Sequence, residues 1–178
     1  IRDGELRERG LDPVTVRRWF QRHHGMTFHA YQRARRMADA ITEMKRGESV
    51  AAAAFGSGYE SLSAFQDAMR ALTKRPPSRS RDVLLVHLSH LLTPLGPMLL
   101  GTAGDAVCLL EFTDRRMLET QLQRLATKLQ CTFVPGSPPV ADATRTELDD
   151  YFAGRRREFT VPVATPGSEF QQKVWDAL

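Results

Sequence analysis

The stretch DPVTVRRWFQRHHG, residues 12–25, has the pattern of a short helix with a defined start and end. Asp12 belongs to the residue types that cap the amino end of a helix, and Pro13 suits the first helical position. Gly25 suits the residue that follows the carboxyl end. The spacing of the larger side chains predicts an inner face consisting of Val16, Trp19, Phe20 and His23. The stretch therefore predicts an amphipathic helix over residues 13–24.

Arg17 and Arg18 lie on the predicted outer face, near the start of this helix. Arginine can form two parallel hydrogen bonds with guanine, and the major groove of DNA admits one helix. From this helix alone, a solvated arginine-rich surface explains the pair at least as well. Residues 1–81 carry 16 Lys and Arg against 9 Asp and Glu, whereas residues 82–178 carry 9 against 12. A polyanionic partner would therefore belong to the first half.

The plan of a short helix, a glycine turn and a second helix appears again over residues 49–72. Ser49 suits the cap of a helix over residues 50–55, which Gly56-Ser57-Gly58 ends, and Ser61 suits the cap of a helix over residues 62–72. A longer helix over residues 28–46, capped by Thr27, would hold the two units apart. Its stripe of apolar and aromatic side chains consists of Phe28, Tyr31, Ala34, Ala38 and Ile41.

The pattern changes after Pro76-Pro77-Ser78-Arg79-Ser80, which is typical of a linker. Strands are predicted over residues 83–92, 98–102, 106–112, 131–134 and 159–163. Helices are predicted over residues 115–129 and 140–152, the first capped by Asp114, and Ser168 suits the cap of a last helix. Strands followed by packed helices favour an α+β domain.

The first 80 residues contain specific motifs. The second unit supplies Gly58-Tyr59-Glu60-Ser61 and then Phe65; the first unit and the long helix supply Arg18, Phe20, Gly25, Tyr31 and Arg35-Arg36. On these residues the region resembles the tandem helix-turn-helix domain of AraC-type transcription regulators. One departure is the leading helix of the first unit, which is reduced to Asp3–Arg9.

The resemblance implies two recognition helices that enter successive major grooves of double-stranded DNA. By position, the expected base-facing residues are Val14, Thr15, Arg17 and Arg18 in the first helix, and Leu62, Ser63, Gln66 and Asp67 in the second. Arg22 is expected to meet phosphate. The second set is poor in hydrogen-bond donors, and Asp67 would repel phosphate unless it accepts from a cytosine amino group. For Arg33, Arg35 and Arg36, we favour a solvated or ion-paired surface over a phosphate contact.

The second half resembles the amino-terminal part of the methylated-DNA–protein-cysteine methyltransferases, above all the Ada-type proteins that join it to an AraC-type module. The matching stretches are 93–98, 108–112, 114–116, 147–156 and 170–175. The resemblance implies a ribonuclease-H-like α/β domain, followed by the first helix of the domain that repairs DNA. It divides the chain into an all-helical domain over residues 1–78, the α/β domain over residues 82–167, and a truncated domain that begins at residues 168–178.

The chemistry of that family needs a thiolate in a Pro-Cys-His-Arg motif, which takes the alkyl group from O6 of guanine after the base is flipped out. The motif does not occur in this sequence. Cys108 and Cys131 lie in apolar strand patterns and are predicted to be structural thiols. We expect no catalytic residue, no metal site and no cofactor in these residues. His23-His24 fits helix packing better than a metal pair, and two cysteines cannot build the zinc-bound methyl-acceptor domain of many Ada-type proteins.

The chain begins at Ile1 and stops inside a helix pattern, so we expect a piece of a longer protein. That protein would regulate transcription from promoter DNA and repair O6-alkylguanine stoichiometrically, with RNA polymerase left open as a further partner. Two alternatives remain: a pure regulator with a degenerate methyltransferase-like domain, and a repair enzyme whose helical module only localises it on DNA. With no run of 18 apolar residues and no leader, we expect the bacterial cytoplasm and nucleoid rather than a membrane.

Overall fold

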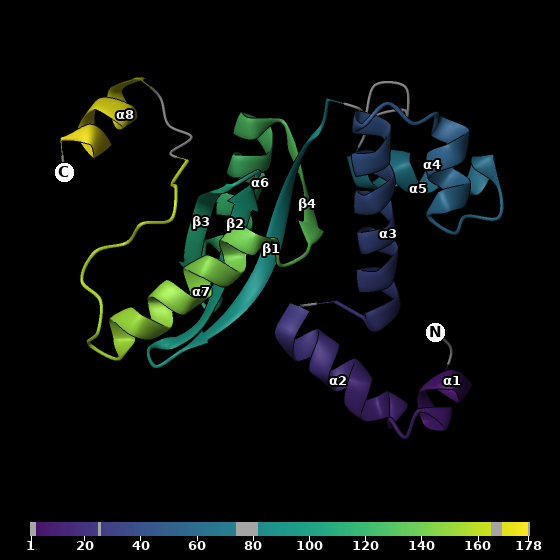
Figure 1. Ribbon diagram of the computed structural model, residues 1–178, viewed down its shortest axis with the longest axis horizontal. Coiled ribbons are helices and arrows are strands. Elements are labelled where there is room, and N and C mark those ends of the chain that lie inside the picture. The colour runs from purple at the N-terminus through teal and green to yellow at the C-terminus, as the bar shows by residue number, and fades with distance from the viewer. Residues whose placement is uncertain (1–2, 25, 74–81, 165–168, 178) are drawn as a thin grey trace. The chain divides into compact units, whose positions relative to one another are not determined.

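The computed structural model describes residues 3–24, 26–73, 82–164 and 169–177 (Figure 1). The chain divides into two compact units, Ile1–Asp82 and Val83–Leu178, and each is described by itself. The predicted linker over residues 76–80 and the predicted cap Ser168 lie outside the described residues. In the part that the structure describes, no helix combines the length and the apolar character that crossing a membrane requires.

The described part of the first unit consists of five helices: α1 (Asp3–Glu8), α2 (Pro13–His24), α3 (Phe28–Lys45), α4 (Val50–Gly56) and α5 (Leu62–Thr73). The predicted caps are confirmed. Thr27, Ser49 and Ser61 each accept a hydrogen bond from the backbone N–H three residues further on. Asp12 accepts from the N–H groups of both Val14 and Thr15. These contacts fix where four of the helices begin, because the first N–H groups of a helix have no partner inside it.

The core of the first unit forms around α3. Five of its side chains are buried, namely Met37, Ala38, Ala40, Ile41 and Met44. Ala53 and Ala54 of α4 and Phe65 and Met69 of α5 complete the core. Figure 1 shows α2 at the amino end of α3, with α4 and α5 towards its carboxyl half.

One prediction for α2 is wrong. Trp19 was expected on the inner face, but 48% of its surface is exposed. Its ring lies at the edge of a cluster of rings, 5.1 Å from Phe20, which itself packs 4.8 Å from Phe28 and 5.1 Å from Tyr31.

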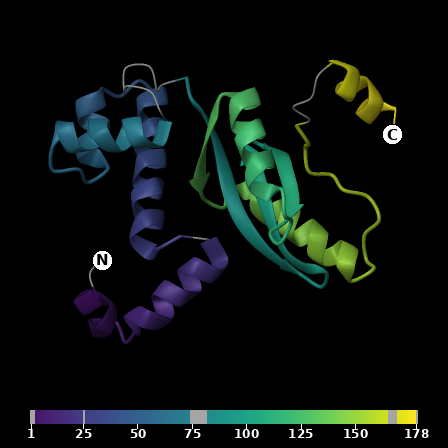
Figure 2. The ribbon, with the colours of Figure 1, turned by 180° about the vertical axis from the view of Figure 1, so that it is seen from behind.

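The second unit is a four-stranded sheet with helices, and its strands correspond to four of the five that the sequence predicted. Its strands are β1 (Leu84–Thr93), β2 (Gly96–Ala103), β3 (Ala106–Phe112) and β4 (Cys131–Pro135), in the order β3-β2-β1-β4. The pairs β1–β2 and β2–β3 are antiparallel, and β1–β4 is parallel. The helices are α6 (Leu118–Leu129), α7 (Pro139–Phe152) and α8 (Glu169–Asp176). Figures 1 and 2 place α7 on one face of the sheet and α6 on the other.

The buried cluster between α7 and the sheet consists of Leu91, Met98, Leu100, Val107, Val140, Ala141 and Leu148. α6 begins three residues later than predicted, at Leu118, and its cap residue Met117 makes no side-chain cap bond. The predicted cap Asp114 is therefore wrong. Arg115, expected in the helix, instead donates two hydrogen bonds to Glu111 of β3, at 2.8 and 3.0 Å.

The strand predicted over residues 159–163 is also wrong, because this segment forms only one bridge, between Val163 and Val107. At this bridge, the backbone N–H of Val107 donates to the carbonyl of Pro162 and the N–H of Ala164 donates to the carbonyl of Val107, both at 2.8 Å. The start of the segment is held by Glu147 of α7 instead. The backbone N–H groups of Thr160 and Val161 donate to its carboxylate at 2.8 and 3.4 Å, and the Thr160 hydroxyl donates as well. Arg156 lies 3.5 Å away, and Glu147 exposes only 9% of its side chain.

The hydrogen bond from the Thr160 hydroxyl is the main reason that the pKa of Glu147 lies below its ordinary value of 4.5. A group whose pKa is lowered by folding stabilises the fold above its unfolded pKa, and this contribution is lost as the pH falls through its folded pKa. We therefore predict that Glu147→Gln lowers the melting temperature of the second unit at pH 7, and that the difference from the unaltered protein shrinks below about pH 4.

Thermal unfolding monitored by circular dichroism at several pH values measures this difference. Asp149→Asn, which removes an exposed carboxylate of the same helix, is the matched control and should cause little change. An equal loss of stability in Glu147→Gln at pH 3 and pH 7 would contradict the assigned role of the carboxylate.

We propose that the two units fold independently, because each has its own core and Pro76-Pro77 separates them in the sequence. Trypsin under native conditions should cut first between residues 78 and 82 and leave two resistant fragments, identified by mass spectrometry. A single cooperative unfolding transition, with the first cleavage inside residues 106–160, would show one folding unit instead.

Candidate nucleic-acid interface

The amino end of α2 is held by Asp12. Its carboxylate accepts from the backbone N–H of Val14 at 3.2 Å, and from the N–H and hydroxyl of Thr15 at 2.9 and 2.7 Å. The hydrogen bond from the Thr15 hydroxyl is the largest cause of the lowered pKa of Asp12. Thr15, predicted to face a base, therefore already uses its hydroxyl in the cap. Val14 is 47% exposed and can present its methyl groups.

Arg17 and Arg18 differ although they are neighbours. Arg17 is exposed but forms an ion pair with Asp3 of α1, and the hydrogen bond from Arg17 holds the pKa of Asp3 below its ordinary value. Arg18 is exposed and has no hydrogen bond or ion pair with another described residue. Arg18 is thus the donor that α2 presents without first breaking a contact. The side chain of Arg22, the predicted phosphate contact, lies outside the described residues.

The four predicted residues of the second recognition helix lie in the first two turns of α5. Ser63, Gln66 and Asp67 are exposed, whereas Leu62 is half-buried. Asp67 lies 3.7 Å from Arg70, one turn further along, so its negative charge has a positive neighbour. The Ser63 hydroxyl lies 3.2 Å from that of Ser61, the cap residue. Gln66 is therefore the member of this set with the most freedom to donate.

The structure assigns Arg36 a contact that the sequence prediction missed. Its guanidinium donates to the backbone carbonyl of Gly58 at 3.4 Å and lies 5.6 Å from the centre of the Tyr59 ring. Gly58 has a φ of +77°, a conformation that favours glycine, and the Tyr59 ring packs edge-on against buried Phe65 at 5.2 Å. Arg36 therefore joins α3 to the turn between α4 and α5, and a purely solvated surface does not describe it.

The two cysteines have the environment of structural thiols. Cys108 is half-buried on β3, and its thiol donates weakly to the carbonyl of Gly101 at 3.4 Å. Burial raises the pKa of Cys108 to about 11 and also raises that of Cys131. A nucleophilic cysteine needs the opposite shift, since the thiolate is the reactive form. Among the described residues no group of three or more His, Cys, Asp and Glu side chains is placed to hold a metal ion.

Comparison with known families decides the nature of the first unit. The helix-turn-helix domain family matches residues 7–82. The first unit is therefore an AraC-type helix-turn-helix domain. Such a domain implies DNA binding. The match includes α2, α3, α4 and α5 in full and the end of α1.

The other half of the chain has relatives of a different kind. The methylated-DNA–protein-cysteine methyltransferase of Mycobacterium leprae is 30% identical over 94 residues, which cover 53% of this chain and 51% of the relative. The constitutive enzyme of Bacillus subtilis is 33% identical over 86 residues, which cover 48% of each protein. A crystal structure of the Mycobacterium tuberculosis O6-methylguanine methyltransferase is 27% identical over 52% of this chain and 50% of that one, with a TM-score of 0.42.

The chain spans about half the length of the curated relatives that it matches. It thus joins the AraC-type domain to a region homologous to the amino-terminal part of O6-methylguanine methyltransferases, which is an Ada-like arrangement. The sequence resemblance to these two families is confirmed.

We predict that this chain takes no methyl group from DNA, because its two thiols remain protonated at neutral pH. Incubation with duplex DNA containing O6-[³H-methyl]guanine should leave the protein unlabelled, under conditions where a complete methyltransferase is labelled. Cys108→Ser is the test variant and Cys131→Ser the control. Stoichiometric labelling that Cys108→Ser abolishes would overturn the structural role of Cys108.

Proposed function

We propose that this protein binds DNA sequence-specifically through the AraC-type domain and regulates transcription. The observation that carries the proposal is the pair of separately capped helices, α2 and α5, whose first turns present exposed polar side chains. α2 offers the exposed guanidinium of Arg18, which has no hydrogen bond or ion pair with another described residue, and α5 offers the amide of Gln66. In the major groove, an arginine side chain can form two hydrogen bonds with guanine, and a glutamine side chain can form two with adenine. Both helices are therefore built to contact base edges.

The dimensions of the first unit support binding to two successive grooves. The 18 residues of α3 span about 27 Å, since a helix rises about 1.5 Å per residue. Successive major grooves on one face of the duplex lie about 34 Å apart. The recognition helices pack against different parts of α3, so we expect one protein molecule to reach two successive grooves.

We propose further that regulation is coupled to repair of O6-alkylguanine in the longer protein to which these residues belong. The Ada-like arrangement supports this, because it places a DNA-binding domain beside the amino-terminal part of an alkyl-acceptor enzyme. The residues that would accept the alkyl group are expected elsewhere in that protein, since the described thiols are protonated at neutral pH. In the longer protein, promoter DNA is then the ligand of the AraC-type domain, and alkylated DNA is the substrate of the methyltransferase.

A second candidate is a regulator without repair activity. The two partly buried cysteines agree with it as well as with coupled repair, because burial raises the pKa of both thiols and a nucleophilic cysteine needs a lowered one. The reading frame of the gene distinguishes the two. A Pro-Cys-His-Arg sequence after residue 178 supports coupled repair, and a stop codon close to that residue supports the pure regulator.

Arg18 provides the sharpest test of sequence-specific binding. We predict that Arg18→Ala lowers the preference for promoter DNA over random DNA by about 1–3 kcal/mol, the cost of one lost arginine–guanine pair. Arg17→Ala should have the smaller effect, because Arg17 must leave Asp3 before it can bind a base. Gel-shift titrations with DNA from upstream of the protein's own gene, at several salt concentrations, measure both preferences.

Asp67→Ala is the control on the second helix. It removes a negative charge from the proposed interface, so its affinity for random DNA should hold or rise. If Arg17→Ala and Arg18→Ala both keep the full preference for promoter DNA over random DNA, α2 does not recognise the DNA sequence.

A further inference from the structure

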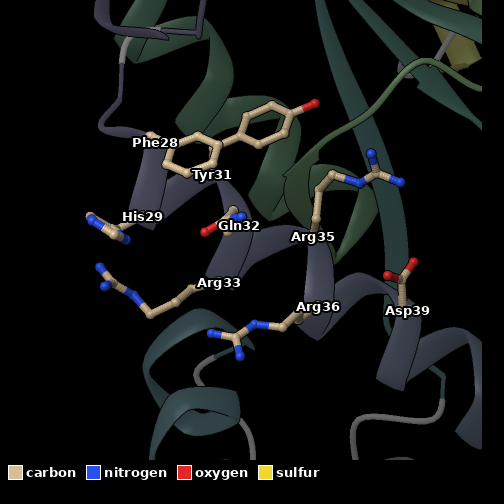
Figure 3. Close-up of a pocket in the computed structure, with 8 residues that line it drawn as sticks. All are labelled: Phe28, His29, Tyr31, Gln32, Arg33, Arg35, Arg36 and Asp39. Atoms are coloured by element: carbon tan, nitrogen blue, oxygen red, sulfur yellow. The ribbon is translucent and has the colours of Figure 1, made fainter. Parts of the chain in front are cut away.

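One histidine and two arginine side chains form a row along one face of α3. His29, Arg33 and Arg36 are four and three residues apart, which places them above one another on a helix. Figure 3 shows these three side chains on one side of α3, whereas Arg35 and Asp39 project to the other side. The helix surface here borders an open groove of about 810 Å³. We call His29, Arg33 and Arg36 the α3 row.

The α3 row connects the surroundings of the two recognition helices. At its first end, the hydrogen bond from Arg17 of α2 is the main cause of the lowered pKa of Asp3, and the charge of His29 adds to the shift. At its other end, Arg36 contacts Gly58 and Tyr59, just before α5 begins at Leu62. If α2 and α5 lie in successive major grooves, the α3 row faces the stretch of DNA backbone between them.

The three members of the row are not equally available to a ligand. Arg36 already donates to the Gly58 carbonyl and lies beside the Tyr59 ring. Arg33 lies between Arg36 and His29, is exposed, and has no hydrogen bond or ion pair with another described residue. An exposed guanidinium without a protein partner can bind an anion without first breaking a contact. Its planar fork also matches two phosphate oxygens at once.

We propose that Arg33, with His29 beside it, binds a backbone phosphate of the DNA that passes between the two recognition helices. The proposal rests on the proposed function, because it needs both helices in successive grooves. The row from residue 29 to residue 36 rises about 10 Å, and the duplex carries one phosphate charge per about 1.7 Å of axis. Phosphates are thus dense along the whole length of the row. A contact here holds the register of both helices and carries no sequence information.

Arg35 is the matched control for the experiment. It belongs to the same helix, is also exposed, lacks a hydrogen bond or ion pair with a described residue, and projects away from the α3 row, although it lines the same groove. Fluorescence anisotropy with the full chain would compare a promoter duplex with a random duplex of equal length, between about 50 and 200 mM salt. One lost phosphate contact lowers the slope of log K against log salt by about 0.9.

We expect Arg33→Ala to weaken binding to both duplexes by the same factor and to lower the salt slope by about one unit. Its deficit should grow about three-fold between 200 and 50 mM salt. Arg33→Lys should keep the slope, because lysine also binds phosphate as a point charge. Arg35→Ala should match the unaltered protein. Circular dichroism should show the same helix content in all three variants.

Equal slope changes in Arg33→Ala and Arg35→Ala would overturn the proposal, because net charge alone would explain them. A loss of promoter preference in Arg33→Ala at constant slope would also overturn it and assign Arg33 to a base. The proposed function fails in a different way. In that case the unaltered protein shows no promoter preference, while the slope of Arg33→Ala still reports the phosphate contact.

Discussion

The burial of α3 is the constraint on which the first unit depends. α4 and α5 have seven and twelve residues, and helices of this length are marginal in water on their own. They gain stability by packing small and large side chains against the inner face of α3, whose Met37, Ile41 and Met44 are almost completely buried. The orientation of α5, the proposed second recognition helix, therefore comes from the buried side of α3. Residues on the outer faces can change without loss of the fold.

Much of this fold follows from local signals in the sequence. The caps Asp12, Thr27, Ser49 and Ser61 predict helix starts because a side-chain oxygen three residues before a free N–H is a local arrangement. The sheet follows from its strand and turn pattern. The predictions that failed are those that depend on tertiary contacts. Arg115 forms hydrogen bonds with Glu111, and α6 begins only after it. Glu147 binds the backbone of Thr160 and Val161, which the sequence predicts as part of a strand. No local sequence pattern indicates either contact.

In the candidate interface, too, local spacing could be predicted from the sequence, but contacts between distant residues could not. Spacing along a helix predicts which residues share its outer face, and the exposure of Arg18 and Gln66 agrees with it. Spacing does not predict that Arg17 pairs with a residue fourteen positions earlier, or that Arg36 contacts the turn 22 positions later. The sequence signal for this turn was Gly58 itself, whose φ of +77° favours glycine, but nothing in the sequence pairs the turn with Arg36.

The Arg17–Asp3 pair gives α2 an internal competitor for DNA. A phosphate or an unsuitable base must displace a carboxylate that is already in place, so random DNA gains little from Arg17. A guanine offers two acceptors in the correct geometry, so two hydrogen bonds with guanine can replace the ion pair with Asp3. In the proposed interface, displacing Asp3 costs the same free energy whichever partner Arg17 meets, so only a contact stronger than the ion pair opens it. Weak contacts with random DNA leave the pair closed, and the charge of Arg17 is then withheld from the general attraction for phosphate.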